Sequence, residues 1–408
     1  MKLLHLADLH LGRLFHEQSL IEDQNYMLDQ VLDILSQDHY TALLMAGDLY
    51  DRSIPSTEAV NLFGSFLNTM HSRFPALAIF IIAGNHDSPD RLAFGHELFR
   101  SMNIHIVSDP EFSWTPVILE DGEERCAVFP LPFLYPGSLT AELREQRRSL
   151  RTQQELVAEA VRRLQGSRQA LEAEGIRHSV LLAHLFTLGG RESESERIFI
   201  GTAEQVDVRQ FAGFSYVALG HLHRSQQVAE NSWYAGSPLA YSFGEADQQK
   251  VCLEVELPGG SPVRQGAEVA PAAAVRAIPL RPLHPVKRLT AAFAELMEET
   301  IPEAKDLAGA YLEIELTDEH LVENAQRLLQ QRYPLVLSVK QGRAFQALLK
   351  QQTSAQSGMP GTGTDEAGKR QSTLEDFKAF EQTLYGAVDQ EKLDLFTTLL
   401  EQCNHETP

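Results

Sequence analysis

The sequence has few cysteines, and none of them are paired at a metal-binding spacing. Only three of the 408 residues are cysteine, and Cys126, Cys252 and Cys403 lie far apart in the chain. A disulfide framework needs more cysteines than this, and a structural zinc site needs close pairs such as CxxC. We therefore predict three reduced, packed thiols, and neither a disulfide scaffold nor a thiolate zinc site.

Long apolar runs are also missing. No stretch approaches the roughly 18 apolar residues that a membrane-spanning helix requires. The opening residues, MKLLHLADLHLG, carry charges and histidines where a secretory signal peptide has an unbroken apolar segment. These absences predict a cytoplasmic protein with no membrane partner. The hydrophobic fraction of 43% is typical of globular proteins, and the length suggests two or three domains.

Positive charge is scarce. The chain has 35 Lys and Arg residues against 56 Asp and Glu residues, a formal net charge of −21. Phosphate binding normally depends on clustered Lys and Arg, so the charge alone argues against a broad nucleic-acid surface. It leaves room for a nucleic-acid enzyme in which metal ions supply the local positive charge. The sequence also has no GxxxxGK[ST] loop, so any dependence on ATP must come from a partner.

The first part of the chain, from Met1 to about Leu257, alternates short apolar runs with amphipathic segments, which is typical of an α/β domain. The apolar runs are predicted strands: Leu3–Ala7, Ala42–Ala46, Leu77–Ala83, Ser179–Ala183, Tyr216–Leu219 and Val251–Leu257. Helices are expected over Ser56–Met70, Arg91–Met102 and Ala141–Glu174.

Composition changes divide the rest of the chain. A Pro-, Gly- and Ala-rich stretch over 257–275 ends the first domain, 1–257, and a small α+β domain is expected over 276–345. Its predicted elements are helix-like Val286–Glu299, strand-like Tyr311–Leu316, helix-like Glu319–Arg332 and strand-like Leu335–Val339. A flexible linker is expected over 351–371, followed by a helical segment over 372–403. Two short helices cannot form a core of their own, so they are expected to dock on this chain or on a partner.

Five polar motifs each follow one of the predicted strands directly. They are Asp8-Leu9-His10, Gly47-Asp48-Leu49-Tyr50-Asp51, Gly84-Asn85-His86-Asp87, Ala183-His184 and Gly220-His221-Leu222-His223. Ligand-binding loops of an α/β sheet gather at the carboxyl ends of its strands, so the five motifs are expected to meet at one edge. A single motif of this kind is common by chance, whereas five in order point to a site.

The residue types in these motifs indicate a metal centre. Asp, Asn and His provide oxygen and imidazole nitrogen ligands and no thiolate, which suits Mn²⁺, Fe or Zn²⁺ better than a soft metal. In Asp8-Leu9-His10 and His221-Leu222-His223, alternate side chains point the same way if the backbone is extended. A glycine before Asp48, Asn85 and His221 permits a sharp turn and a close backbone approach.

The series DLH, GDLYD, GNHD, an isolated His and GHLH resembles the signature of the calcineurin-like metallophosphoesterases. The segments LLHLADLHLGRLF, LLMAGDLYDRSIPS, AGNHDS, FIGT, YVALGHLHR and YAGSPLAYSFGE are similar to its SbcD-type nuclease branch, which is related to the meiotic-recombination double-strand-break nuclease. The resemblance is strong up to about residue 250. It implies an α/β fold with two sheets flanked by helices, a small capping domain and tethered C-terminal helices.

The resemblance also implies two divalent metal ions, for which it favours Mn²⁺. The ligands implied for the first ion are Asp8, His10, Asp48 and His223. Those implied for the second ion are Asp48 as a bridge, with Asn85, His184 and His221.

Two further residues are implied to take part in catalysis. His86 is expected to contact the substrate phosphate or the leaving group and not to bind metal. Asp51 matches the family position that pairs with this histidine and sets its tautomer. The alternative for Asp51 is an ordinary turn or capping carboxylate.

The activity implied is that of a DNA exonuclease and endonuclease in DNA repair, recombination and hairpin processing. The implied partners are DNA, an SbcC-type ATPase whose coiled coil takes the terminal helices, and a second copy of the chain bound through Ser56–Met70 and Arg91–Met102. The apolar anchors expected at the ATPase contact are Phe377, Phe380, Leu384, Leu395, Phe396 and Leu399.

Two other classes of function stay open from the sequence. The first is a phosphoprotein phosphatase or cyclic-nucleotide phosphodiesterase on the same core, which would not need the extra domain and the tethered helices. The second is a scaffold subunit without catalysis, which the complete set of expected ligands disfavours.

Overall fold

The computed structural model describes residues 1–139, 150–193, 205–258, 273–298, 300, 307–342, 374–382 and 387–405. The chain divides into two compact units, Met1–Val286 and Lys287–Pro408. The first unit extends past the predicted boundary at residue 257, because a strand over Ala274–Pro279 pairs with Val251–Glu256. The predicted linker 351–371 and the FIGT segment lie outside the described residues.

The first unit is built on two six-stranded sheets. The first sheet has the order β16-β15-β1-β4-β5-β6. Its parallel strands are β1 (Lys2–Leu6), β4 (Ala42–Met45), β5 (Ala78–Ile82) and β6 (Ile104–Val107). Two antiparallel strands, β15 (Val251–Glu256) and β16 (Ala274–Pro279), complete one edge.

The second sheet has the order β13-β14-β12-β9-β8-β7. Its parallel strands are β8 (Glu124–Leu131), β9 (His178–His184), β12 (Tyr216–Gly220) and β14 (Ser232–Tyr234). The antiparallel edges are β7 (Val117–Asp121) and β13 (Gln226–Ala229). All six predicted strands of the first domain are present in the two sheets, because each is an apolar run that the sandwich buries.

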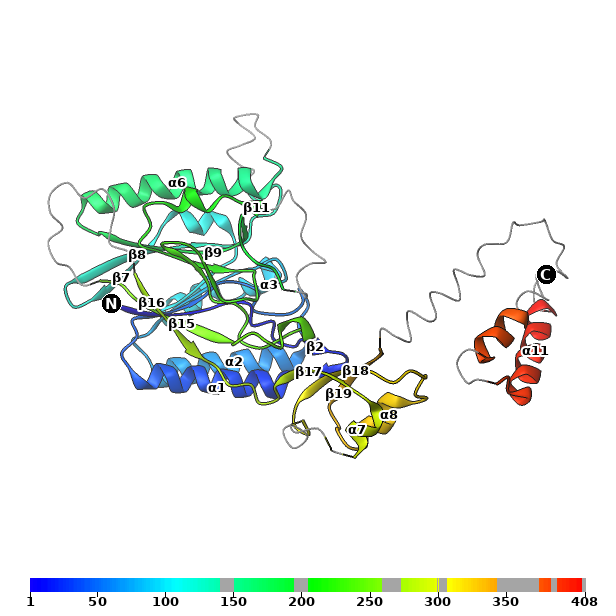
Figure 1. Ribbon diagram of the computed structural model, residues 1–408. Helices are drawn as coiled ribbons and strands as arrows, with labels where there is room; N and C mark the ends of the chain where they lie inside the picture. Colours follow the sequence, from blue (N-terminus) through cyan, green and yellow to red (C-terminus); the bar gives the residue numbers. More distant parts are fainter. Residues whose placement is uncertain are drawn as a thin grey trace. The chain divides into compact units, whose positions relative to one another are not determined.

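The core lies between the sheets. Phe80 of the first sheet shares one buried cluster with Val128 and Leu182 of the second. The outer face of the second sheet packs on α6 (Gln153–Ala173), and α1 (Ile21–Gln37) and α2 (Thr57–Arg73) cover the outer face of the first (Figure 1). The predicted two-sheet α/β fold flanked by helices is therefore confirmed.

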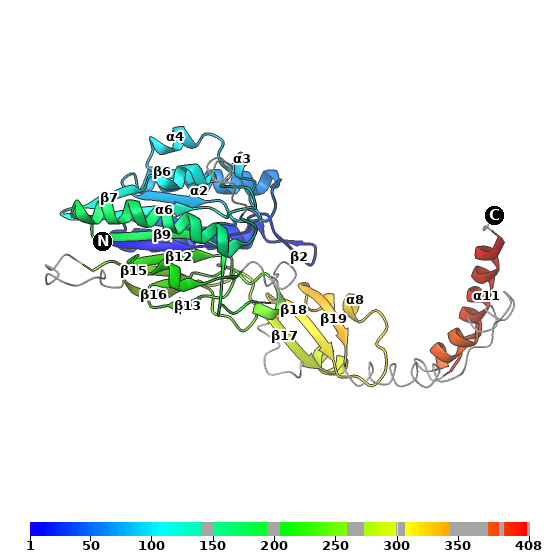
Figure 2. The same cartoon turned by 90° about the horizontal axis from the view of Figure 1, so that it is seen from above.

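The helix predicted over Arg91–Met102 is interrupted. The structure has α3 (Pro89–Leu92) and α4 (His96–Arg100), and Gly95 between them is left-handed, with φ +74°. A left-handed residue cannot continue an α-helix, so the segment turns and α4 lies beside β6 (Figure 2).

The second unit begins with a small α+β fold. Its sheet has the order β17-β18-β19, formed by Val286–Ala291, Tyr311–Leu316 and Val336–Gln341. The helices α7 (Phe293–Met297) and α8 (Ala325–Gln330) complete its apolar core. The helix predicted over Val286–Glu299 is wrong in its first half, which is β17. Arg288 of β17 forms an ion pair with Glu313 of β18, with Nε and Oε1 3.0 Å apart. Contacts across the sheet therefore outweigh the helical preference of the local sequence.

The terminal segment forms two helices, over 374–382 and over Gln390–His405 (α11). Phe377 stacks on Phe396 with the ring centroids 4.0 Å apart, which joins the two helices. Phe380 and Leu395 are 50% and 62% exposed. Two of the predicted anchors thus hold the helices together and two face solvent, while Leu384 and the side chain of Leu399 lie outside the described residues.

Cys126 and Cys252 are buried free thiols, as predicted, and burial raises the pKa of each to about 12. The side chain of Cys403 lies outside the described residues. Among the described helices, none has the length and apolar character needed to cross a membrane.

Candidate metal centre

The five polar motifs meet at one edge of the sandwich. Each lies at or just after the carboxyl end of β1, β4, β5, β9 or β12, as predicted. Main-chain hydrogen bonds join the first two loops, from Asp8 N to Gly47 O at 3.1 Å and from His10 N to Asp48 O at 3.0 Å. Motifs spread over more than half of the sequence therefore form one cluster.

One group of side chains surrounds His10. The Nε2 atoms of His10 and His223 lie 3.1 Å apart, and His10 Nε2 is 3.7 Å from Asp48 Oδ2. All three side chains are buried. Two imidazole nitrogens at this spacing can serve as neighbouring ligands of one ion, because metal–nitrogen bonds are about 2.0–2.1 Å long.

A second group surrounds Asn85. Its Oδ1 atom lies 3.0 Å from His184 Nε2 and 3.0 Å from His221 Nδ1. The other ring nitrogen of His184, Nδ1, donates to the main-chain carbonyl of Ala46 at 2.8 Å. This bond leaves the lone pair of His184 on Nε2, next to Asn85 and available to a metal ion.

Two carboxylates connect the groups. Asp48 Oδ2 lies 3.4 Å from His184 Nε2 and 3.7 Å from His10 Nε2, so it lies between a ligand of each implied ion. Asp8 accepts from the main-chain nitrogen of His221 at 2.9 Å. All seven implied ligands are thus joined by direct contacts.

The backbone of the site is locally strained. Asp8, His10, Asp48 and His221 have φ values of 53°, 42°, 48° and 107°. Positive φ is uncommon outside glycine, and it concentrates at functional sites where the surrounding fold holds it in place. Four of the seven implied ligands therefore depend on the fold to keep their positions.

Two glycines permit the close packing, as predicted. A Cβ atom on Gly84 would lie 2.1 Å from Asp48 Oδ1, and one on Gly220 would lie 1.8 Å from the carbonyl oxygen of Ala46. Neither position has room for a side chain.

The electrostatics of the cluster fit a bound cation. Burial raises the pKa of Asp8 to about 7 and lowers that of His221 to about 3. Burial would also raise the pKa of Asp48, but His184 holds it well below its usual value. Burial lowers the pKa of His184, yet Asp48 and Asp8 raise it to about 9. Such opposed shifts show carboxylates and imidazoles crowded together, an arrangement that divalent cations stabilise.

The donor set also fits a metal. Two groups, His10–Asp48–His86 and Asp8–Asp48–His184, each bring three possible ligand atoms within 4.8 Å of one another, and the first includes His86, which the resemblance does not imply as a ligand. His10 Nδ1 is buried without a hydrogen-bond partner in the described part of the chain. Its Nε2 faces another imidazole nitrogen, so the ring gains little from hydrogen bonding and is suited to binding an ion.

His86 pairs with Asp51, but not through the carboxylate that the sequence suggested. His86 Nδ1 lies 2.9 Å from the main-chain carbonyl oxygen of Asp51. The Asp51 carboxylate accepts from Arg13 Nη1 at 2.8 Å and lies 3.7 Å from His10 Nδ1. The main chain of His86 donates to Asp48 Oδ1 at 2.9 Å, which fixes its loop beside the cluster.

Two supporting residues were not predicted from the sequence. Gln24 of α1 donates to the carbonyl of His10 at 2.8 Å and accepts from the Gly12 nitrogen at 2.9 Å. Asp87 accepts main-chain bonds from Leu49, Tyr50 and Gly84 at 3.1, 2.9 and 2.9 Å. Asp87 ends the GNHD motif and was thus open to prediction, whereas nothing local marks Gln24.

A buried ion pair behind His223 was also missed. Glu245 accepts from Lys250 Nζ at 2.7 Å and lies 3.3 Å from His223 Nδ1. Glu245 has no exposed surface and Lys250 is 8% exposed. The segment YAGSPLAYSFGE ends in Glu245, but its sequence does not reveal which histidine the carboxylate meets.

A family model described as calcineurin-like phosphoesterase matches residues 1–225. The chain belongs to the calcineurin-like phosphoesterase family. A second model, described as type 5 capsule protein repressor C-terminal domain, matches residues 282–382. Family membership implies divalent metal ions, and the structure brings together two groups of side chains that could hold a metal ion.

Curated relatives narrow the resemblance within this phosphoesterase family. The chain is 29% identical over 342 residues to the SbcD component of the nuclease SbcCD of Staphylococcus epidermidis, covering 83% of this chain and 85% of that protein. It is 29% identical over 341 residues to the protein of the same name from Staphylococcus saprophyticus, covering 83% and 84%. The predicted resemblance to the SbcD-type branch is confirmed.

Among solved structures, the chain is similar to the calcineurin-like phosphoesterase YfkN of Bacillus subtilis, with 13% identity, a TM-score of 0.38 and coverage of 68% and 90%.

Proposed function

We propose that this chain is a DNA nuclease, both exonuclease and endonuclease, and the catalytic subunit of an SbcCD-like complex in DNA repair and recombination. The observation that carries the proposal is the position of Asp48, whose Oδ2 lies within 3.7 Å of His10 Nε2 and 3.4 Å of His184 Nε2. A carboxylate between two ligand groups suits a two-metal phosphoesterase. The curated relatives are named as nuclease subunits, which supports a nucleic acid as the substrate.

The metal ligands proposed are those that the resemblance implied. Asp8, His10, Asp48 and His223 would hold the first ion, and Asp48, Asn85, His184 and His221 would hold the second. Their oxygen and imidazole donors suit Mn²⁺, Fe or Zn²⁺, and of these we propose Mn²⁺, which the resemblance favours. When bound, the two ions lower the pKa of a water molecule and stabilise negative charge on the phosphoryl oxygens.

The remaining chemistry belongs to His86. Its Nδ1 hydrogen is donated to the Asp51 carbonyl, which turns Nε2 into the atom available for proton transfer. We propose that Nε2 of His86 donates a proton to the leaving oxygen of the phosphodiester. Asp51 is then a positioning residue that acts through its main chain, and its carboxylate holds Arg13.

The test is cleavage of end-labelled single-stranded and hairpin DNA by the purified chain with Mn²⁺. An Asp48→Asn variant serves as the control for contaminating nucleases, because it removes the proposed bridging charge. Cleavage by the wild type and none by the variant is the expected result. Hydrolysis of a phosphomonoester with intact DNA, even when the ATPase partner is added, would instead assign the site to a phosphatase.

The net charge of the chain should limit its affinity for DNA. Its net charge of −21 predicts weak DNA binding that salt reduces further, with much of the DNA-binding surface supplied by a partner. Tight, salt-resistant binding by the purified chain would contradict this.

The partner proposed is an SbcC-type ATPase, bound at its coiled coil through the terminal helices. Phe377 and Phe396 stack between the two helices, whereas Phe380 and Leu395 are exposed on their outer faces. Exposed apolar side chains on a short helix pair suit a helical partner that covers them.

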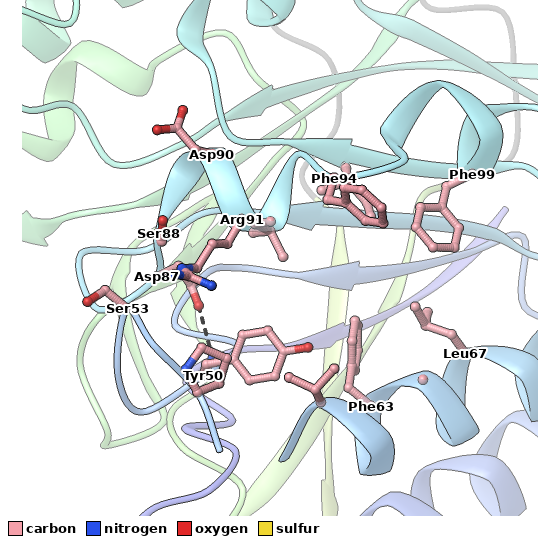
Figure 3. Close-up of a pocket in the computed structure, with 15 residues that line it drawn as sticks. Tyr50, Ser53, Phe63, Leu67, Asp87, Ser88, Asp90, Arg91, Phe94 and Phe99 are labelled. Atoms are coloured by element: carbon pink, nitrogen blue, oxygen red, sulfur yellow. Dashed lines mark hydrogen bonds between the residues drawn. The ribbon is translucent and has the colours of Figure 1, made fainter. Parts of the chain in front are cut away.

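Homodimerisation is proposed through the surface of α2, α3 and α4. Phe94 and Leu98 are 85% and 75% exposed there, and Val60 of α2 is 45% exposed. Beside them lies a hollow of about 550 Å³, across which Phe63 and Leu67 face Phe94 and Phe99 (Figure 3). Apolar side chains gathered in this way mark an interaction surface, and a second copy of the chain is its proposed occupant.

The small α+β unit is proposed to cap the active site. The segment that leads to it is held on α1, where His284 Nδ1 lies 3.1 Å from Asp23 Oδ1 and Gln30 Oε1 accepts from Arg281 N at 2.9 Å.

A further inference from the structure

We infer that Glu245, held in place by Lys250, is a positioning residue that orients the imidazole of His223 for metal binding. The inference rests on the proposed metal centre and deepens it. It assigns a role to a buried ion pair that neither the motifs nor the family match explains.

The geometry places the carboxylate behind the ring. Glu245 Oε1 lies 3.3 Å from His223 Nδ1, and at the opposite side of the ring His223 Nε2 lies 3.1 Å from His10 Nε2. The two ring nitrogens thus face different partners, one a carboxylate and the other the metal cluster.

This arrangement selects the tautomer. Glu245 accepts from Lys250 Nζ at 2.7 Å and from Ser242 Oγ at 3.0 Å, so the carboxyl group is ionised and acts only as an acceptor. The hydrogen between Glu245 and His223 must then lie on Nδ1. The lone pair of His223 is left on Nε2, where a metal ion needs it, and the carboxylate makes that nitrogen a stronger donor.

Lys250 holds the same histidine at a second point. Its Nζ donates to the main-chain carbonyl of His223 at 3.0 Å and to Ser237 Oγ at 2.9 Å. The ion pair therefore fixes both the ring and the backbone of one ligand. A buried ion pair costs desolvation energy that packing alone does not require, which favours a role beyond simple filling of the core.

Two other histidines of the site differ in this respect. The rings of His184 and His86 are held by main-chain carbonyls, of Ala46 and Asp51. A carbonyl sets the tautomer of the ring but carries no full charge. Removing the charge of Glu245 should therefore weaken the binding of one metal ion, the one proposed to bind His223, more than that of the other.

The experiment compares Mn²⁺ binding to the wild type, Glu245→Gln and the control Glu254→Gln, with free Mn²⁺ measured by electron paramagnetic resonance. Glu254 is also a buried glutamate, 7% exposed, and it pairs with Arg276 at 3.0 Å away from the site. We expect two Mn²⁺ sites in the wild type and in Glu254→Gln. In Glu245→Gln one site should weaken by about 10- to 100-fold while the other keeps its affinity.

A purely structural role gives a different pattern. Glu245→Gln would then lower the unfolding midpoint and leave both Mn²⁺ affinities unchanged, which overturns the inference and leaves the proposed function standing. A wild type that binds no Mn²⁺ overturns both.

A second measurement on the wild type does not depend on whether the variant folds. In ¹⁵N-histidine-labelled, metal-free protein, long-range ¹H–¹⁵N correlations report which ring nitrogen carries the hydrogen. The His223 signal, assigned by its loss in His223→Gln, should show Nδ1 protonated. A hydrogen on Nε2 overturns the inference.

Discussion

His86 Nδ1 lies 2.9 Å from the main-chain carbonyl oxygen of Asp51, while the carboxylate of the same aspartate binds Arg13. A carbonyl only accepts, so the bond fixes a hydrogen on Nδ1 and leaves Nε2 for proton transfer. The backbone of residue 51 thus holds the ring of His86. Substitutions at the two positions should therefore have unequal effects.

His86→Ala is expected to lower the rate of DNA cleavage by about 10²- to 10⁴-fold, the usual contribution of a positioned acid or base. It should leave Mn²⁺ stoichiometry unchanged, because His86 is not among the proposed ligands. Steady-state cleavage rates and metal content of the same preparations check both parts.

Asp51→Asn is the matched comparison for His86→Ala. It keeps the main-chain carbonyl that holds His86 and removes the charge that pairs with Arg13. We expect a much smaller loss of rate than for His86→Ala. Equal losses in the two variants would mean that the Asp51 carboxylate itself takes part in the chemistry.

Leu98→Glu and Leu395→Glu test the proposed dimer surface and the proposed ATPase-binding surface, and each variant is the control for the other. Both side chains are mostly exposed, 75% and 62%, so a glutamate should fit without disturbing the fold. Leu98→Glu places a charge on the proposed dimer surface and should weaken self-association at least tenfold, which is about 1.4 kcal/mol. Sedimentation equilibrium measures this association.

Leu395→Glu should leave self-association unchanged and weaken binding of the ATPase coiled coil instead, as measured by pull-down with the purified partner. If each variant affects the other interaction, the assignment of the two surfaces is wrong.

The pH dependence of stability should carry a contribution from His5. Its ring is buried and its Nδ1 lies 2.9 Å from the hydroxyl of Tyr216. Burial lowers its pKa from 6.5 to about 3. Between these values the unfolded chain binds a proton that the folded chain does not, so stability falls as the pH falls below 6.5.

From this shift, the free energy of unfolding should drop by about 2 kcal/mol more between pH 7 and pH 5 in the wild type than in His5→Gln. Glutamine stays neutral and can still accept from the tyrosine. Urea unfolding at the two pH values measures the difference. The same drop in both proteins would show that other groups account for the pH dependence.

The strands and the metal cluster were predictable because their signals are local. A buried strand is a short apolar run, and Asp8 and Asp48 follow two such runs directly. Parallel strands then carry these residues to one edge, so proximity in space follows from position in the chain. The proposal of which residues share an ion comes from the resemblance, because the spacing of the motifs does not divide the ligands between two ions.

What escaped prediction depends on contacts between distant segments. Gln24 reaches the loop of His10 from the next helix, and Glu245 meets His223 from 22 residues further along the chain, with nothing in the local sequence to show either contact. The strand β17 shows the same limit, because its Lys, Arg and Leu residues favour a helix until a neighbouring strand offers pairing. The carboxylate of Asp51 was assigned to His86 because a motif gives spacing, whereas which atom of the residue makes the contact depends on the turn.

The close approach of β12 to the loop after β4 can be tested with two glycine substitutions. In Gly220→Ala the new Cβ would lie 1.8 Å from the carbonyl oxygen of Ala46 and 3.0 Å from His184 Nδ1. Because the first contact is with backbone, the two sheets must shift apart at the metal cluster. We expect a loss of stability at or above the upper end of the about 1–3 kcal/mol range for overpacking, together with weaker Mn²⁺ binding.

Gly166→Ala is the matched control, since Gly166 lies within α6 and a Cβ there meets no atom within 4 Å. Alanine in place of an exposed helical glycine should raise stability by about 0.5–1 kcal/mol and leave Mn²⁺ binding unchanged. Urea unfolding and Mn²⁺ titration of both variants measure these effects. Normal stability and metal binding in Gly220→Ala would show that the contact between β12 and Ala46 is not needed to hold the ligands in place.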